Sequence, residues 1–233
     1  MTRRFRPAPI SESGSALVLV LLGPPGAGKG TQGRLLADSE GLLVLSTGDI
    51  LRAAVRTGTT LGKRADGYMR AGELVPDELI DDLMAERLAQ PDTRSGFILD
   101  GYPRTGGQAH ALTEVLRGRQ LNLTAAVEFE ASDEEVVRRL SGRRSCPACG
   151  SVYHVEFGPP AQSGRCDRDG EQLVRRDDDE PETIHNRLAV YRRDTRPVAD
   201  YYRELGVLLP VDAAREPGEV QASLRASLAS TLA

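Results

Sequence analysis

Leu17-Val-Leu-Val-Leu-Leu22 runs directly into Gly23-Pro-Pro-Gly-Ala-Gly-Lys-Gly-Thr31, and this stretch decides the fold. Its first part is a run of apolar strand-formers, and its second part has the spacing G-x-x-x-x-G-K of a nucleotide phosphate-binding loop. Glycines let successive backbone N–H groups face a phosphate without Cβ clashes, and a helix that begins near Gly30 directs its positive end at the same place. Lys29 adds a point charge for the β- and γ-phosphates. A glycine-rich turn that binds nothing would not need four glycines and a lysine in this order.

The composition limits the classes of protein that this chain can form. Its 233 residues are enough for one domain with inserts and a sizeable core. The formal net charge of −4 argues against general binding to nucleic acid or membrane surfaces, and no apolar run approaches the length of a membrane span. The three cysteines all fall between residues 146 and 166, which does not suggest the disulfide framework of a secreted protein. We expect a cytoplasmic protein.

The first residues superficially imitate a secretory leader. Arg3, Arg4 and Arg6 precede the apolar stretch 16–22. Cleavage after that stretch would destroy the phosphate-binding loop that follows it. We therefore expect residues 1–15 to be a disordered N-terminal tail.

Apolar runs of strand length alternate with longer helical patterns along the chain. This alternation predicts right-handed crossovers and a parallel sheet with helices on both faces, with ligands bound beyond the carboxyl ends of the strands. The capping box formed by Ser132 and Glu135 predicts the start of one helix. The expected strands are Leu17–Leu22, Leu42–Leu45, Phe97–Leu99, Ala125–Phe129 and Val207–Val211. The expected helices are Gly30–Ser39, Asp77–Ala89, Gln108–Leu116, Ser132–Leu140, Glu182–Leu205 and Pro217–Leu232. Two stretches interrupt the alternation: residues 46–75 are polar and helical in pattern, and residues 143–176 are rich in Gly, Pro and Cys.

The phosphate-binding loop resembles that of adenylate kinases, because Gly30 replaces the usual Ser or Thr after the lysine and the hydroxyl follows at Thr31. Other motifs of this family occur at Leu45-Ser-Thr-Gly-Asp-Ile-Leu-Arg52, Ala71-Gly-Glu-Leu-Val-Pro-Asp77 and Phe97-Ile-Leu-Asp-Gly-Tyr-Pro-Arg-Thr105. The resemblance extends from Leu17 to Val211. It implies an α/β fold of the P-loop nucleoside monophosphate kinase type: a five-stranded parallel sheet flanked by helices, with a helical monophosphate-binding insert and a zinc-knuckle lid. The corresponding core is residues 16–45, 76–142 and 180–233, the insert is 46–75, and the lid is 143–179.

The resemblance also implies a reaction, the reversible transfer of the γ-phosphoryl group of Mg·ATP to AMP, which gives two ADP. It places ATP against Gly26, Ala27, Gly28, Lys29, Gly30, Thr31, Arg139, Arg143 and Tyr153. It places AMP against Thr47, Arg52, Glu73, Leu74, Val75, Gly101, Arg104, Gln108, Arg176 and Arg187. The residues expected to carry catalysis are Lys29, Arg104, Arg143, Arg176 and Arg187. Asp100 would hold magnesium through water, because Mg²⁺ gives up its hydration reluctantly.

Two cysteine-containing turns in the second interruption predict a metal site. Cys146-Pro-Ala-Cys149-Gly150 and Cys166-Asp-Arg-Asp169-Gly170 match the C-x₂-C…C-x₂-C zinc pattern except for the final residue. Zinc accepts an aspartate oxygen in place of a thiolate, and four protein ligands leave no open position, so the zinc would be structural. Asp167 or His154 could replace Asp169 as fourth ligand, and a redox dithiol is the competing interpretation of Cys146 and Cys149. A zinc-bearing, long-lid type of the resembled family has Cys, Cys, Cys and Asp at this spacing.

Two alternatives to an AMP-specific enzyme remain open at this point. The enzyme could prefer CMP, UMP or GMP, since Gly106 and Gly107 precede the residue expected to contact adenine, Gln108, where bulkier residues are common in the family. The chain could also be a zinc-module binding protein that uses ATP only as a switch. The acidic charge balance argues against the second alternative. We expect a monomer whose partners are ATP, AMP and ADP, with no nucleic acid and no membrane.

Overall fold

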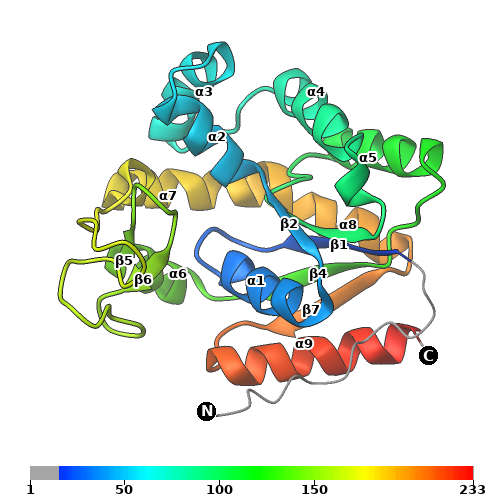
Figure 1. Cartoon of the computed structure of the whole chain (residues 1–233). Helices are drawn as coiled ribbons and strands as arrows, with labels where there is room; N and C mark the ends of the chain where they lie inside the picture. The colour runs from blue at the N-terminus through cyan, green and yellow to red at the C-terminus, as the bar shows by residue number, and fades with distance from the viewer. Residues whose placement is uncertain (1–15, 233) are drawn as a thin grey trace.

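A computed structural model describes residues 16–232 of the chain, so the expected tail, 1–15, lies outside the described residues. Five parallel strands form one sheet in the order β2-β3-β1-β4-β7 (Figure 1). The five-stranded parallel sheet predicted from the sequence is therefore confirmed. Its strands are β1 (Leu17–Leu22), β2 (Leu43–Ser46), β3 (Gly96–Asp100), β4 (Ala125–Glu130) and β7 (Leu208–Asp212).

The central strand β1 is buried along its whole length. Successive residues of a strand face opposite sides of the sheet, so Val18 and Val20 join one apolar core whereas Leu19 and Leu21 join the other. The first core includes residues of α4 (Asp77–Leu88), α5 (Gly106–Gly118) and α8 (Arg196–Glu204). The second includes residues of α1 (Lys29–Glu40) and α9 (Pro217–Leu232). Helices on both faces explain why this parallel strand is a continuous apolar run without alternation (Figure 1).

One long helical run follows the second interruption and returns across the sheet. The sequence pattern predicted a single helix, Glu182–Leu205, but the structure contains α7 (Pro181–Val190), a π-helical turn η3 (Tyr191–Thr195) and then α8. Pro197 explains the difference: it has no N–H, and its ring would clash with the carbonyl group four residues earlier in a regular α-helix. A π turn is one of the local changes that accommodate such a residue.

The two interruptions form separate excursions from the core. The first contains α2 (Thr47–Arg56) and α3 (Thr60–Ala71), which confirms its helical pattern. The second follows α6 (Asp133–Gly142), whose predicted start is confirmed because the Ser132 hydroxyl accepts a hydrogen bond from the Glu135 N–H, whereas the Glu135 side chain accepts from Arg139. It contains a short antiparallel pair, β5 (Arg143–Ser145) and β6 (Val152–His154), which the sequence did not predict. Short 3-10 turns occur at η1 (Pro91–Thr93) and η2 (Asp177–Asp179).

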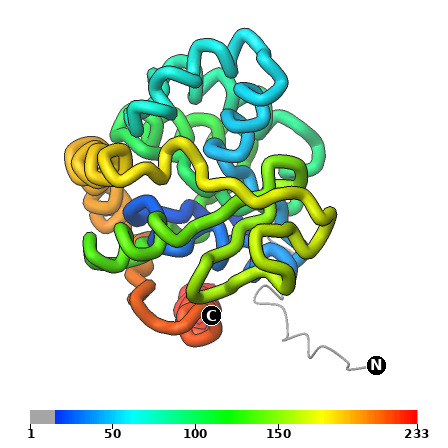
Figure 2. The backbone as a smooth tube through the Cα atoms, turned by 90° about the vertical axis from the view of Figure 1, so that its left-hand side faces the viewer, coloured from blue at the N-terminus to red at the C-terminus, as the bar shows by residue number. Residues whose placement is uncertain are grey.

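Figure 2 shows the second excursion in front of the core, with α2 and α3 above it and α9 below it. Each excursion therefore lies beside the carboxyl ends of the strands, where the phosphate-binding loop follows β1. Among the helices of residues 16–232, none is long and apolar enough to cross a membrane.

Candidate functional site

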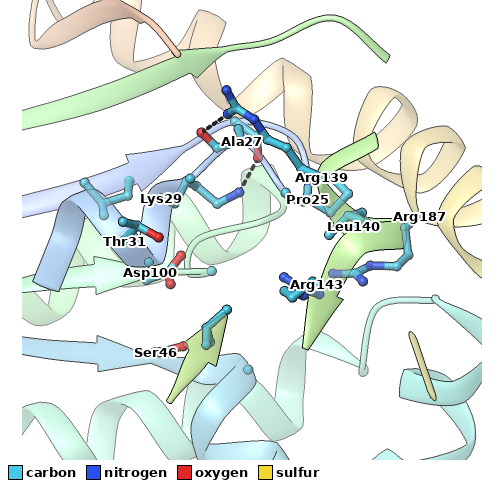
Figure 3. Close-up of a pocket in the computed structure, with 18 of the residues that line it drawn as sticks. Pro25, Ala27, Lys29, Thr31, Ser46, Asp100, Arg139, Leu140, Arg143 and Arg187 are labelled. Carbon is cyan, nitrogen blue, oxygen red and sulfur yellow. Dashed lines mark hydrogen bonds between the residues drawn. The ribbon is translucent and has the colours of Figure 1, made fainter. Parts of the chain in front are cut away.

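A cleft of about 810 Å³ lies where the phosphate-binding loop, the start of α2, the end of β3 and the second excursion meet. Every residue that the sequence analysis assigned to ATP, AMP or magnesium lines this one cleft. Figure 3 shows Lys29 facing the guanidinium groups of Arg143 and Arg187 across it. The residues predicted for ATP and those predicted for AMP therefore line the same cavity.

The phosphate-binding loop is organised by its lysine. The Lys29 Nζ donates hydrogen bonds to the carbonyl oxygens of Gly23 (2.7 Å) and Pro24 (2.8 Å). Burial lowers the pKa of Lys29 to about 8, although the Asp100 carboxylate acts in the opposite direction. Helix α1 begins at this lysine, and its N-cap, Gly28, provides no side-chain cap. The free N–H groups of its first turn, with the positive end of the helix dipole, make this a suitable anion-binding site.

The unusual glycine after the lysine lies close to the carboxylate that ends β3. A Cβ atom at Gly30 would lie 3.2 Å from Asp100 Oδ2, tighter than an ordinary contact. The serine or threonine that usually stands here would therefore crowd Asp100. A side chain at position 30 would therefore require Asp100 to move by a few tenths of an ångström.

The side of the cleft that is predicted to bind the acceptor is built on α2 and on the turn after β3. The Thr47 hydroxyl donates to the carbonyl oxygen of Gly101 (2.8 Å), which joins the two segments. Arg52 donates to Asp49 Oδ1 (2.6 Å), and Asp49 also accepts from Arg34 (3.1 Å). Burial alone would raise the pKa of Asp49, but the hydrogen bond and charge of Arg52 lower it. Asp49 therefore stays ionised and holds Arg52 at the cleft. Asp49 and Arg52 are three residues apart on α2, a spacing that could have predicted this ion pair from the sequence.

Gln108 is buried and belongs to a hydrogen-bond network. Its Oε1 accepts from the backbone N–H of Arg104 (2.7 Å), and its Nε2 donates to Asp77 Oδ1 (2.8 Å). Asp77 also accepts from the Thr105 hydroxyl, which caps α5. Within residues 16–232 the Gln108 amide makes these two side-chain hydrogen bonds, and its contact with adenine stays a prediction. The contact between Asp77 and Gln108 was not predicted, because the two residues are 31 positions apart in the sequence.

The glycine pair before Gln108 lies in the first turn of α5. Gly106 and Gly107 therefore have a regular helical setting and are not part of a loop. The Thr105 hydroxyl accepts from the Gln108 N–H (3.2 Å), which closes this turn.

Two cleft arginines are held by one buried carboxylate. Both Nε and a terminal nitrogen of Arg143 donate to Asp179, whose side chain is fully buried, with Nε 2.7 Å from Oδ2. Arg187 donates to Asp179 Oδ1 (3.2 Å) and pairs with Asp178 (3.0 Å). Paired, charge-assisted hydrogen bonds of this kind fix direction as well as distance. Asp179 therefore brings two of the predicted site residues, Arg143 of the second excursion and Arg187 of α7, to one point of the cleft.

Arg139 and Tyr153 have different surroundings. Arg139 donates to Glu135 (2.6 Å) and to the carbonyl oxygen of Ala213 (2.8 Å), and it connects the phosphate-binding side with the loop after β7. The Tyr153 hydroxyl accepts from the Asp167 N–H (2.8 Å) and lies 3.5 Å from Cys166 Sγ. Any contact of Tyr153 with a nucleotide would therefore use its ring or backbone.

Three thiols and one carboxylate gather in the second excursion. Ligand atoms of Cys146, Cys149, Cys166 and Asp169 all lie within 4.8 Å of one another. The sulfur atoms of Cys149 and Cys166 are 3.5 Å apart, and Cys146 Sγ lies 3.4 Å from Asp169 Oδ1. The ligand atoms around tetrahedral zinc with Zn–S bonds of about 2.3 Å are separated by roughly 3.5 to 3.8 Å. The donor set and its spacing therefore fit a zinc ion.

The alternative ligands are engaged elsewhere. His154 Nδ1 accepts the backbone N–H groups of Glu156 and Phe157, both at 3.1 Å. Asp167 Oδ1 accepts from the Ala161 N–H (2.8 Å). Of the three candidates for the fourth ligand, Asp169 is the one that the structure brings to the thiols.

The two cysteine turns have the same backbone geometry. The N–H of Gly150 donates to the carbonyl oxygen of Cys146 (3.0 Å), and the N–H of Gly170 donates to that of Cys166 (2.9 Å). Both glycines have φ near +74°, a conformation that favours glycine. The repeated knuckle recognised in the sequence is therefore present.

A phosphate-binding loop and an arginine-rich acceptor side that share one cleft define a P-loop phosphotransferase of the nucleoside monophosphate kinase class. Comparison with known proteins agrees, since residues 21–207 match the family described as "Adenylate kinase". The chain belongs to the adenylate kinase family.

Similar proteins named adenylate kinase occur in distant organisms. One from Archaeoglobus fulgidus is 48% identical over 198 residues, which cover 85% of this chain and 91% of that protein. One from Geobacter sp. strain M21 is 50% identical over 210 residues, covering 90% and 98% of the two chains. One from Salinispora tropica is 52% identical over 195 residues, covering 84% and 90%. The resemblance inferred from the motifs is confirmed.

Proposed function

We propose that this chain catalyses the reversible transfer of the γ-phosphoryl group of Mg·ATP to AMP, which gives two ADP. The observation that carries the proposal is the single cleft lined by the phosphate-binding loop on one side and by Thr47, Arg52 and Arg104 on the other. Two nucleotides placed end to end in it would bring their phosphates together at Arg143 and Arg187. Membership of the adenylate kinase family supports the same reaction.

The proposed mechanism depends on position and charge. Lys29 and the N–H groups at the start of α1 would hold the β- and γ-phosphates, while Arg52 and Arg104 hold the phosphate of the acceptor. The acceptor oxygen can then approach the γ-phosphorus in line. Arg143, Arg176 and Arg187 would neutralise charge on the transferred group. These effects supply most of the rate in phosphoryl transfer.

Asp100 is suited to a hydrated magnesium ion. Its carboxylate ends β3, reaches the start of α1 beside Gly30, and lines the cleft. Oxygen ligands and retained waters are what Mg²⁺ prefers. Asp100 would hold this ion through water, and the ion would supply positive charge that stabilises the phosphates of ATP.

We further propose that Cys146, Cys149, Cys166 and Asp169 hold a structural zinc ion in a lid formed by residues 143–179. The metal would supply folding energy to a segment with few buried apolar residues. A metal-free redox dithiol would not need the third thiol and the carboxylate that complete the cluster.

The lid and the 46–75 insert would close over the two nucleotides. Arg56 of the insert donates to the carbonyl oxygen of Pro147, inside the first cysteine turn (3.1 Å). Contact between these excursions supports a closed arrangement that excludes water, which would otherwise compete as phosphoryl acceptor. The residues expected to bind both nucleotides are all present in this cleft, so the proposed reaction of a monomer requires no residue from a second subunit.

The first experiment is to measure ADP formation from Mg·ATP with AMP, CMP, UMP or GMP offered separately. We expect a strong preference for AMP. Lys29→Met is the blank, and we expect its rate to fall by about 10²- to 10³-fold or more, since loss of one charge-stabilising donor has this effect in other enzymes. Circular dichroism would show that this variant remains folded.

The other outcomes distinguish the alternatives. Preference for another monophosphate would retain the phosphotransferase and reject the adenine contact of Gln108. No transfer to any acceptor would contradict the proposal and favour an ATP-switched binding protein, which a salt-dependent oligonucleotide-binding assay would test.

The zinc proposal has a matched pair of variants. We expect Asp169→Asn to lose most of its bound zinc, because an amide is a poor substitute for the carboxylate ligand. Asp167→Asn changes the same charge two residues away and should keep zinc. Metal analysis of the purified proteins measures both, and equal zinc content in the two variants would reject Asp169 as a ligand.

A further inference from the structure

Arg176 is held differently from the other arginines of the cleft. Arg143 and Arg187 both donate to the carboxylate of Asp179. Within residues 16–232, Arg176 makes a single side-chain hydrogen bond, from its Nε to the hydroxyl of Ser145, at 2.7 Å. Ser145 is the last residue of β5 and is buried, with 7% of its surface exposed.

We propose that Ser145 is a positioning residue that aims the guanidinium group of Arg176 at the phosphates in the cleft. The proposal rests on the phosphoryl transfer proposed above. A bond through Nε leaves both terminal nitrogens for two phosphate oxygens, the bidentate geometry that guanidinium groups favour. The hydroxyl is also uncharged, so it fixes direction without neutralising the arginine, whereas Asp179 offsets part of the charge of its partners.

The surroundings of Arg176 explain why an anchor is needed. Burial lowers the pKa of Arg176, and the neighbouring charges of Arg143 and Arg52 act in the same direction. Asp178 and Asp179 offset part of this repulsion, but neither carboxylate forms a hydrogen bond with Arg176 in the described residues, so charge alone does not fix the direction of its guanidinium. The hydrogen bond to Ser145 fixes this direction before a phosphate is bound.

The backbone near Ser145 is fixed independently of its hydroxyl. Its N–H donates to the carbonyl oxygen of Val174 (2.8 Å), and its carbonyl oxygen accepts from the Val174 N–H (2.9 Å). Val174 is two residues before Arg176, and the thiol-bearing Cys146 follows Ser145 directly. Substitution of the hydroxyl alone therefore leaves the strand pairing and the cysteine turn in place.

Steady-state kinetics of three variants test the proposal. We expect Ser145→Ala to lower kcat and kcat/KM together by about tenfold, the effect of one lost hydrogen bond to a charged group that acts in the transition state. Ser145→Thr keeps the hydroxyl and should restore most of this rate. Ser163→Ala removes an exposed lid hydroxyl and should match the parent enzyme. Bound zinc should be equal in all of them.

A double-mutant cycle separates positioning from a general structural role. We expect Arg176→Ala to be slow and Ser145→Ala to cause no further loss when it is added to that variant. An additional tenfold loss in the double variant would overturn the proposal, because Ser145 would then act through something other than Arg176.

The parent enzyme distinguishes failure of this inference from failure of the proposed function. If the parent forms ADP and Ser145→Ala is equally fast, the positioning role of Ser145 is rejected and the reaction stands. If the parent forms no ADP with any acceptor, the proposed reaction is rejected and this inference with it.

Discussion

The phosphate-loop end of the core and the lid both present positive charge to the same cleft, but different forces hold them. The loop follows β1, whose residues are buried between two apolar cores. In the lid, the buried apolar cluster consists of Cys146, Cys166 and Leu173, with two partly buried neighbours. Its order depends on polar contacts, such as those of Arg143 with Asp179 and of Ser145 with Arg176, and on the proposed metal.

This difference predicts that the phosphate-binding loop is more rigid than the lid. Hydrophobic packing fixes the phosphate-binding loop for as long as the domain stays folded. Polar contacts at the lid are individually weaker and can be exchanged for contacts with water or phosphate. Under the proposed function the cleft would combine a fixed anion site with a lid that can open, and the stabilities of the two regions should be separable.

Removal of the metal should have the largest effect on the difference in stability between the lid and the core. Structural zinc contributes on the order of 10 kcal/mol to the folding of small zinc modules. We expect chelation to raise amide hydrogen exchange in residues 143–176 by tenfold or more, as about 1.4 kcal/mol of lost local stability would suffice for that change. Exchange in β1, β3 and β4 should stay within about twofold, and added zinc should restore the lid. Equal acceleration in both regions would contradict the separation.

A cavity in the core should affect both regions together. Leu19 lies in β1 and is 0% exposed. We expect Leu19→Ala to lower the free energy of unfolding by about 2 to 5 kcal/mol, the range for large-to-small changes in apolar cores. Leu35→Ala is the matched control, because Leu35 is 43% exposed and its loss should change stability by less than about 0.5 kcal/mol. Urea denaturation measures both, and similar values for the two variants would mean that β1 is not the stabilising element.

Local patterns in the sequence predicted more of this molecule than long-range ones. The five strands, the capped start of α6 and the cysteine knuckles follow from apolar runs or fixed spacings within about ten residues. The contacts of Asp77 with Gln108 and of Ser145 with Arg176 were not predicted. The partners in each pair are 31 positions apart, and no fixed spacing predicts such a contact. The β5–β6 pair was missed because its strands are only three residues long. The polar contacts that position the side chains of the cleft could therefore not be predicted from the sequence and were identified only in the structure.

The last prediction concerns the proton of Lys29. Its pKa of about 8 is below the value of 10.5 for an unburied lysine, so burial disfavours its charged form. Well below pH 8 the lysine is charged in the folded and unfolded chains, and the full destabilisation caused by its burial is present. Between pH 8 and 10.5 the folded chain releases the proton first, so this destabilisation decreases as the pH rises.

ATP binding should respond in the opposite direction, because the phosphates require the charged lysine. We expect ATP affinity to decrease by up to about tenfold per pH unit above pH 8, one proton being linked to binding. Calorimetric titrations at pH 7, 8 and 9 measure this. In Lys29→Met, the gain of folding stability and the loss of ATP affinity that this lysine causes above pH 8 should both disappear. The cysteine thiols titrate in both proteins, so the difference between the two proteins isolates the effect of Lys29. An ATP affinity that is unchanged from pH 8 to 9 in the parent would show that a nucleotide does not depend on the charge of Lys29, and the loop would then bind phosphate through its N–H groups alone.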